Sequence, residues 1–474
     1  MLFPTVAFAV FFCAAFLTNW LLRPHVTPWR LAMVAMSLFF YGYWDPRFVP
    51  LLGASIVVNH LAGHAIVVGG RTRTGRAARV ALAIGIVANL GILGFFKYYG
   101  FFATSVTNGL GRFGIDVAPR LLDITLPIGI SFFTFQAIGY LVDLKRGSFH
   151  RALSLLDVAF FLSFFPQLVA GPIVRATEMA PQMATRPDPR SIPAGEAFWL
   201  IGIGLVKKVV ISSYLATNLV DPVFDVPGDH TRFEVLLAIY GYAIQIYADF
   251  SGYTDIAIGC ALLLGFRFPA NFDAPYRALS LRDFWRRWHI SLSSWLRDYL
   301  YIPLGGDRRG RLLTGRNLAI TMVLGGLWHG AAWTFVAWGA MHAALLAGER
   351  IMSHLWRPIG FPERAVRASQ WFVTFHLVCA SWVFFRADTI GQAVDVFGRL
   401  IDGTGAPSTI TVTIVAVIAL SLAAQFVPRE TSARWQMAFN GVNPALQVVI
   451  GALALTTIDS LGPEGVAPFI YFQF

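Results

Sequence analysis

Long apolar runs, separated by short polar loops, recur along the whole chain of 474 residues. A helix needs about 20 apolar residues to cross the hydrocarbon core of a bilayer. Candidate spans lie near residues 3–22, 31–45, 48–68, 79–104, 121–143, 154–174, 196–220, 233–264, 317–347, 369–386, 409–427 and 445–472. This pattern predicts an all-α polytopic membrane protein with about ten to twelve membrane elements. Because no long hydrophilic stretch divides the chain, we expect one membrane domain over residues 1–474.

The run at residues 317–347 contains no Asp, Glu, Lys or Arg, and it carries His329 near its middle. An ionisable group at membrane depth is costly and by default marks a functional site. Trp328 and Gly330 flank this histidine, and Gly325 and Gly326 lie shortly before it. Small residues there let a neighbouring backbone or a substrate approach the imidazole. We therefore predict that His329 is catalytic and that Trp328 supports it.

The segment 273–316 is the polar centre of the chain, and residues 281–300 have the pattern of an amphipathic helix. Its apolar stripe recurs every three to four residues and comprises Leu281, Trp285, Trp288, Leu292, Trp295 and Tyr299. Arg286 and Arg297 fall on the opposite face, and His289 lies at the seam. A helix with this many charged residues does not cross lipid. We therefore expect an interfacial or re-entrant element. His289 is a second catalytic candidate, with a structural interfacial histidine as the alternative.

A basic cluster containing Arg308, Arg309 and Arg316 follows this helix. Guanidinium groups bind phosphate well, so these arginines are candidates for holding a nucleotide-bearing donor such as coenzyme A. Arginines beside a membrane also bind anionic lipid headgroups, at about 1 kcal/mol each. We favour the lipid interpretation for most of the cluster.

A second polar patch, residues 247–255, interrupts an apolar run and contains Asp249, Ser251 and Asp255. Carboxylates at membrane depth rarely face lipid. Asp249 either orients a catalytic ring or forms a structural ion pair, and the two interpretations have equal weight. For Asp255 we favour a structural role, as an ion pair or as a helix cap next to Gly252, and Ser251 is a candidate supporting residue.

The remaining histidines give weaker signals. His60 and His64 are four residues apart, a spacing that can hold a metal ion. No third ligand is evident, so we predict no metal site. His342 follows His329 by thirteen residues and is predicted to be structural.

Composition and charge agree with the span pattern. The chain is 56% hydrophobic and 13% charged, whereas soluble domains have roughly 25% charged residues. The net charge is +11, and the basic loops alternate along the chain, near residues 23–30, 71–79 and 145–151. The positive-inside rule then predicts that these loops are cytoplasmic and that the N-terminus is periplasmic. We expect contacts with membrane lipids and none with nucleic acid.

Several stretches match known motifs in combination: residues 93–99 (LGFFKYY), 126–136 (LPIGISFFTFQ), 165–173 (FPQLVAGPI), 249–255, 284–306, 328–330 (WHG), 381–387 (SWVFFRA) and 469–474 (FIYFQF). Together they resemble the membrane-bound O-acyltransferase (MBOAT) family. The resemblance is to its bacterial branch that O-acetylates polysaccharides, which includes the alginate O-acetyltransferase membrane subunits. It covers nearly the whole chain.

The resemblance implies a ring of transmembrane helices with re-entrant helices around a central funnel, in the bacterial inner membrane. It places the family's two functional positions at His329 and His289. It further implies that an acetyl group moves from a cytoplasmic thioester, acetyl-CoA being the expected donor, toward hydroxyls of an exported polysaccharide such as alginate. A periplasmic acetyltransferase partner would complete the transfer, and no bound cofactor is expected.

The chemistry needs a base, because a hydroxyl is a poor nucleophile near neutral pH. A desolvated histidine stays neutral, so His329 either takes the hydroxyl proton or carries the acetyl group itself. His289 positions the thioester or assists proton transfer, and Asp249 orients one of the rings. Two other functions stay open. In the first, a protein of the same fold acylates another acceptor, such as peptidoglycan, cellulose or teichoic acid. In the second, the chain is not an acyltransferase but transports a lipid-linked sugar.

Overall fold

A computed structural model describes residues 1, 3–68, 75–116, 122, 124–308, 310–355, 362–443, 446, 447, 449 and 470. These residues form helices and turns and include no strand, which confirms the all-α prediction. The predicted span 445–472 lies almost entirely outside the described residues. The chain forms two compact units: Met1–Ala194 with Cys260–Pro269, and Gly195–Gly259 with Ala270–Phe474.

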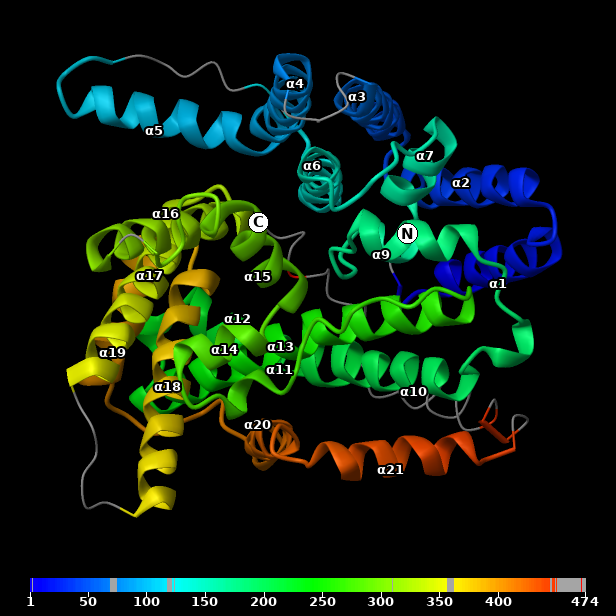
Figure 1. Cartoon of the computed structure of the whole chain (residues 1–474). Helices are drawn as coiled ribbons and strands as arrows, with labels where there is room; N and C mark the ends of the chain where they lie inside the picture. Colours follow the sequence, from blue (N-terminus) through cyan, green and yellow to red (C-terminus); the bar gives the residue numbers. More distant parts are fainter. Residues whose placement is uncertain are drawn as a thin grey trace. The chain divides into compact units, whose positions relative to one another are not determined.

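The helices of the first unit are α1 (Val6–Leu22), α2 (Val26–Gly42), α3 (Val49–Val68), α4 (Arg76–Leu93), α5 (Tyr99–Gly111), α6 (Ile130–Arg146), α7 (Leu155–Ser163), α8 (Phe165–Leu168) and α9 (Ala176–Ala184) (Figure 1). Those that follow are α10 (Ala194–Leu205), α11 (Ser213–Leu215), α12 (Asp221–Asp225), α13 (Arg232–Leu263), α14 (Leu281–Arg287), α15 (Ile290–Leu296), α16 (Arg311–His329), α17 (Trp333–Leu355), α18 (Glu363–Arg386), α19 (Ile390–Asp402), α20 (Val412–Ala424) and α21 (Arg429–Asn440). The last residues of α13 belong to the first unit.

Among the described residues, four helical segments are long and apolar enough to cross a membrane: Pro46–Val68, Arg76–Gly111, Ala194–Asp225 and Glu363–Arg386. They coincide with the predicted spans 48–68, 79–104, 196–220 and 369–386. A fifth candidate is the pair α20 and α21, which bends by 100° at its break. The expected ten to twelve membrane elements and the central funnel stay predictions.

Polar caps explain where several helices begin. A Ser or Thr oxygen accepts the N–H of the third residue after it at the start of α1, α7, α14, α19 and α20; the capping residues are Thr5, Ser154, Ser280, Thr389 and Thr411. The first N–H groups of a helix lack partners within the helix, so such caps stabilise its start. These short polar signals, absent from a hydropathy profile, set the boundaries.

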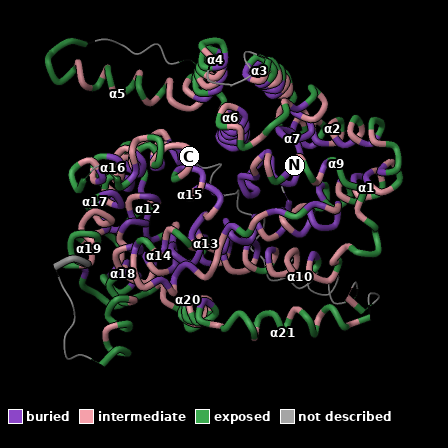
Figure 2. Tube along the Cα trace, viewed as in Figure 1, coloured by how far each residue is buried: buried purple, intermediate pink, exposed green. Residues whose placement is uncertain are grey.

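The first unit is built around α6, which is buried on nearly every side, whereas α5 has no buried residue (Figure 2). A Cβ added at Gly63 of α3 would lie 2.8 Å from the Tyr140 hydroxyl of α6. Between α3 and α4, Asn59 and Asn89 exchange side-chain hydrogen bonds of 3.1 and 2.9 Å. In lipid the hydrophobic effect does not drive helices together, so close backbone packing and interhelical hydrogen bonds of this kind hold them in contact.

In the second unit, the α10–α12 segment crosses α13 closely at glycines. A Cβ at Gly204 would lie 2.6 Å from the Gly252 carbonyl oxygen, and one at Gly252 would lie 2.7 Å from the Gly204 carbonyl oxygen. The α10–α12 segment also contains π-helical turns at Val206–Ser212 and Ala216–Val220. Such turns are rare and frequent at functional sites. The crossing brings two lysines of the first π-helical turn against the polar patch of α13.

Candidate active site

Four of the six residues of the apolar stripe over 281–300 are buried and the other two, Trp285 and Tyr299, are half-buried, but the stripe does not lie on one helix. Leu281, Trp288, Leu292 and Trp295 are buried, while Arg286 and Arg297 on the opposite face are exposed. The chain forms α14, breaks at Trp288 and His289, and continues as α15 and a π-helical turn. The prediction of one continuous helix is therefore wrong.

The break occurs because His289 has a left-handed backbone, with φ of +43°. This conformation is uncommon for a residue other than glycine and clusters at functional sites. Local sequence periodicity contains no signal for it. It is held by bonds that His289 and Ile290 make to Asn271, which lies eighteen residues before His289.

The uncharged run 317–347 is also two helices rather than one span. Gly330 is extended after α16, and α17 begins at Trp333 and runs back along α16. A Cβ at Gly326 would overlap the Phe335 carbonyl oxygen, and one at Gly339 would overlap the Met322 carbonyl oxygen. The backbone of α17 therefore lies against Gly326. His329 is the last residue of α16, at the turn of this helical hairpin, and not midway along a span.

The two predicted catalytic histidines meet at Trp328. His329 is 3% exposed, and its ring centroid lies 5.0 Å from that of Trp328, 5.1 Å from Trp338 and 5.1 Å from Phe385. His289 is fully buried, and its ring lies 5.8 Å from the Trp328 ring. We call these five residues the histidine cluster. They come from α14–α15, from both helices of the hairpin and from α18.

Hydrogen bonds define the state of the His289 ring. Its Nδ1 lies 3.1 Å from Asn271 Oδ1, and its Nε2 is buried with no hydrogen-bond partner among the described atoms. Burial lowers the pKa of His289, because desolvation disfavours the imidazolium. The ring is therefore neutral near pH 7, as a base requires.

Among the described residues, no hydrogen bond joins Asp249 to the ring of His289 or His329. It pairs with Lys208, accepts a bond of 3.2 Å from the Ser212 hydroxyl and accepts one of 2.9 Å from the Ile470 backbone N–H. Of the two interpretations, the structural ion pair is the one observed. Asp255 forms the predicted ion pair, with Lys207 at 2.7 Å.

Ser251, the third residue of that patch, is 1% exposed, and its hydroxyl has no hydrogen-bond partner among the described atoms. Two of the three donor-phosphate candidates are among the described residues. Arg308 and Arg316 are exposed, and Arg316 donates to Asn317 Oδ1 at 3.0 Å. Arg309 lies outside the described residues.

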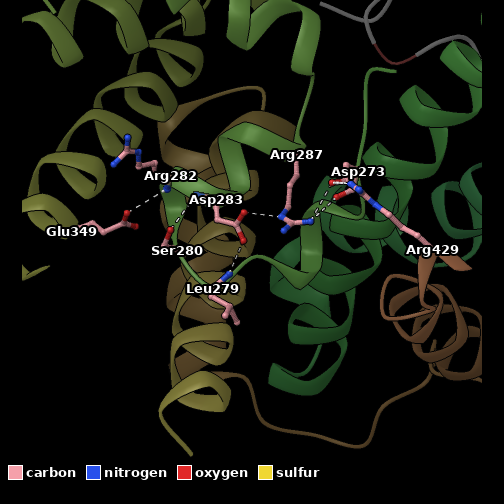
Figure 3. Close-up of polar contacts among 8 residues, drawn as sticks. All are labelled: Asp273, Leu279, Ser280, Arg282, Asp283, Arg287, Glu349 and Arg429. Atoms are coloured by element: carbon pink, nitrogen blue, oxygen red, sulfur yellow. Dashed lines mark hydrogen bonds and ion pairs between the residues drawn. The ribbon is translucent and has the colours of Figure 1, made fainter. Parts of the chain in front are cut away.

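A polar network fixes α14 in place, as Figure 3 shows. Glu349 of α17 accepts the backbone N–H of Leu281 at 2.5 Å and that of Arg282 at 3.4 Å. At the other end of the helix, Arg287 donates to Asp283 at 2.8 Å and to Asp273 at 3.3 Å, and Asp273 also pairs with Arg429 of α21. Side-chain hydrogen bonding to Arg429 lowers the pKa of Asp273.

Hydrogen bonds hold the rings of two other histidines that the sequence singled out, His60 and His342. His60 Nδ1 donates to the Leu153 carbonyl oxygen at 3.2 Å, and its ring contacts that of His64. In the second unit, His342 lies between the Trp285 indole N–H, 3.4 Å from its Nδ1, and the Ser381 hydroxyl, 3.0 Å from its Nε2. Hydrogen bonds at both nitrogens agree with the predicted structural role of His342.

Sequence reasoning missed Asn271 and Lys208. For Lys208 a signal existed, because two adjacent lysines in an apolar run need partners. For Asn271 there was none, since an uncharged amide in a polar loop is ordinary. Among the described residues, no group of three His, Cys, Asp or Glu side chains is arranged to hold a metal ion.

The structure thus defines a class of protein: a helical membrane protein in which two buried histidines, His289 and His329, pack against Trp328. Residues 147–386 match the family model of MBOAT, the membrane-bound O-acyltransferase family. The chain is 39% identical over 404 residues to the "Peptidoglycan O-acetyltransferase" of Helicobacter pylori, covering 79% of this chain and 74% of the relative. It is 35% identical over 469 residues to the "Probable alginate O-acetylase AlgI" of Pseudomonas putida, covering 94% of each.

A more distant relative is the "Teichoic acid D-alanyltransferase" of Bacillus subtilis, 28% identical over 274 residues, which are 54% of this chain and 68% of that protein. The chain belongs to the membrane-bound O-acyltransferase family. It is an O-acyltransferase, which confirms the resemblance seen in the motifs and removes the transporter from the alternatives.

Proposed function

We propose that the protein transfers an acetyl group from a cytoplasmic thioester, acetyl-CoA, to hydroxyls of an exported polysaccharide such as alginate. The relatives named as alginate O-acetylase and peptidoglycan O-acetyltransferase both suggest acetyl transfer to a saccharide. The observation that carries the proposal is the meeting of His289 and His329 at Trp328, in a buried aromatic environment. The protein lies in the inner membrane with its N-terminus in the periplasm.

His329 takes the proton of the acceptor hydroxyl, and His289 assists proton transfer. The hydroxyl oxygen bonds to the acyl carbon, the carbon–sulfur bond breaks, and the proton passes by way of imidazole to the leaving thiolate. General-base assistance of this kind contributes about 10²–10⁴ in rate. The surrounding Trp328, Trp338 and Phe385 side chains exclude water and so limit hydrolysis of the thioester.

Arg308 and Arg316, which are exposed and follow α15 in the chain, hold the phosphates of coenzyme A. A periplasmic acetyltransferase partner completes transfer to the polymer. The Asp249–Lys208 pair fixes α13 against the α10–α12 segment, and so supports the site without contacting the acyl group.

The acceptor is tested in the producing cells by measuring ester-bound acetate, released by mild alkali, in the exopolysaccharide and in the peptidoglycan. We expect His329→Ala to remove acetate from the exopolysaccharide alone. His25→Ala, at an exposed histidine that makes no capping bond, is the matched control and should leave acetate unchanged. Loss from peptidoglycan alone would establish the second candidate, which the 39% identical relative favours. Loss from neither polymer would refute both.

A further inference from the structure

Asn271 connects the loop before α14 to the start of α15. Its backbone carbonyl oxygen accepts the Ile290 N–H at 2.9 Å, and its side-chain Oδ1 accepts the Ser291 N–H at 3.2 Å and the Ser291 hydroxyl at 2.9 Å. Because His289 precedes α15 without capping it, the first N–H groups of this helix would otherwise lack partners. Asn271, which is 2% exposed, caps α15 from a distant part of the chain.

This arrangement determines which amide atom faces His289. A backbone N–H only donates, so the side-chain atom of Asn271 that receives the Ser291 N–H must be the oxygen. The same oxygen lies 3.1 Å from His289 Nδ1. Since a carbonyl oxygen only accepts, Nδ1 must carry the proton of the neutral ring. The lone pair is then on Nε2.

Because Nδ1 is bonded to Asn271, Nε2 is the ring nitrogen of His289 that can accept a proton in the reaction. It is buried and has no hydrogen-bond partner among the described atoms, while its ring packs against Trp328 and Phe250. Buried polar atoms are nearly always bonded, so an exception calls for an explanation. The left-handed backbone of His289 adds a second departure from ordinary structure at the same residue.

We propose that Asn271 is a positioning residue, which fixes His289 in the Nδ1–H tautomer and makes Nε2 an acceptor of protons and hydrogen bonds. This proposal rests on the proposed acyl transfer. It specifies how His289 assists. A neutral ring in this tautomer cannot donate from Nε2 to the thioester carbonyl, so its part in the reaction is to accept a proton that derives from the hydroxyl.

The test compares Asn271→Leu with Asn271→Asp. Leucine removes the acceptor at Nδ1, so we expect kcat to fall by about 10–100-fold with little change in the KM for acetyl-CoA. Aspartate keeps two acceptor oxygens and should restore much of the lost kcat. The matched control is Asn218→Leu, at an exposed asparagine of the same unit, which should retain wild-type kcat.

The second readout is the ¹⁵N spectrum of histidine-labelled protein in detergent, with the His289 signals assigned from a His289→Gln variant. Wild type and Asn271→Asp should show a protonated Nδ1 and an unprotonated Nε2, and Asn271→Leu should lose this pattern. Unchanged tautomer and kcat in Asn271→Leu would overturn the proposal. So would a fall in kcat with the tautomer intact, because that result indicates a purely structural cap.

Two further outcomes keep the proposals separable. Full activity of His289→Ala would refute the catalytic use of His289 itself, whatever Asn271 does. If Asn271→Leu does not fold, the Asn271→Asp spectrum decides, since a proton found on Nε2 there would contradict the role given to Asn271.

Discussion

Two buried imidazoles of the second unit, His289 and His342, have opposite tautomers because their partners differ. The Trp285 indole N–H only donates, so Nδ1 of His342 must accept and its Nε2–H donates to the Ser381 hydroxyl. The Ser381 hydroxyl in turn donates a hydrogen bond to the Val378 carbonyl oxygen at 2.7 Å. At His342 every polar atom is used, whereas at His289 the Nε2 lone pair is left without a partner among the described atoms. This difference separates a structural ring from one available for chemistry.

The Ser381→Ala variant tests the structural interpretation of His342. It leaves the buried Nε2–H without an acceptor, which costs about 1–3 kcal/mol of stability. We expect a lower Tm for the purified protein and little change in kcat at temperatures where the variant is folded. Ser369→Ala, at an exposed serine of the same helix, should leave Tm unchanged. Equal Tm values for the two variants would contradict the assignment.

The role of a single residue could be predicted from the sequence where burying its side chain without a partner would be costly. A carboxylate at membrane depth needs a partner, so the ion pair of Asp255 followed from its position. His329 was singled out as an ionisable group in an apolar run, and His289 by its place on the seam of the aromatic stripe. Their catalytic roles stay predictions. The bond between Asn271 and His289 was not predictable. It depends on a tertiary contact between two loops, and no local pattern distinguishes that asparagine.

At the scale of elements, the hairpin of α16 and α17 sets the position of His329 at its turn. The two helices approach until backbone touches backbone at Gly326 and Gly339. Gly330 then turns the chain directly after the histidine. Hydropathy cannot reveal this fold, because an uncharged run of 31 residues has the same composition whether it crosses once or turns back. The glycine after His329 was the signal for a helix end.

We predict that Gly326→Ala disrupts the hairpin. Its new Cβ would meet the Phe335 carbonyl oxygen, which belongs to rigid backbone, and overpacking of this kind costs about 1–3 kcal/mol. Gly315→Ala lies on the same helix with no atom within 4 Å of the new Cβ, and it should be neutral or stabilising. Thermal unfolding of both purified variants provides the comparison. A Gly326→Ala protein as stable as Gly315→Ala would show that the helices do not cross there.

The network around α14 predicts a pH dependence. Bonding to Arg429, and then to Arg287, lowers the pKa of Asp273 in the folded protein. A depressed carboxyl pKa stabilises the fold above the unfolded value of about 3.9, and this stabilisation disappears as pH falls through the folded value. Arg429→Gln should therefore lower Tm at pH 7 and have progressively less effect in more acidic buffers.

The control for this experiment is Arg434→Gln, which changes an exposed arginine on the same helix α21. Its Tm should match wild type at every pH. A difference between Arg429→Gln and wild type that is constant from neutral to acidic buffer would show that Asp273 is not the group responsible.

At the scale of the whole molecule, the sequence indicated the class of protein more reliably than its layout. Composition and motifs led to an integral membrane O-acyltransferase, and the family match and relatives agree. Only four to five helical elements among the described residues meet a length and hydropathy test for spanning. Short, broken and polar helices such as α14 and α15 make up much of the site, and periodicity predicts their buried face but not their breaks.

We propose that the histidine cluster performs acyl transfer. The most direct measurement is the rate at which purified protein in detergent moves radiolabelled acetyl from acetyl-CoA to a saccharide acceptor. We predict that His329→Ala lowers this rate by at least about 10²-fold while the protein stays folded. His25→Ala should retain the wild-type rate. Transfer at the wild-type rate by a folded His329→Ala protein would contradict the account.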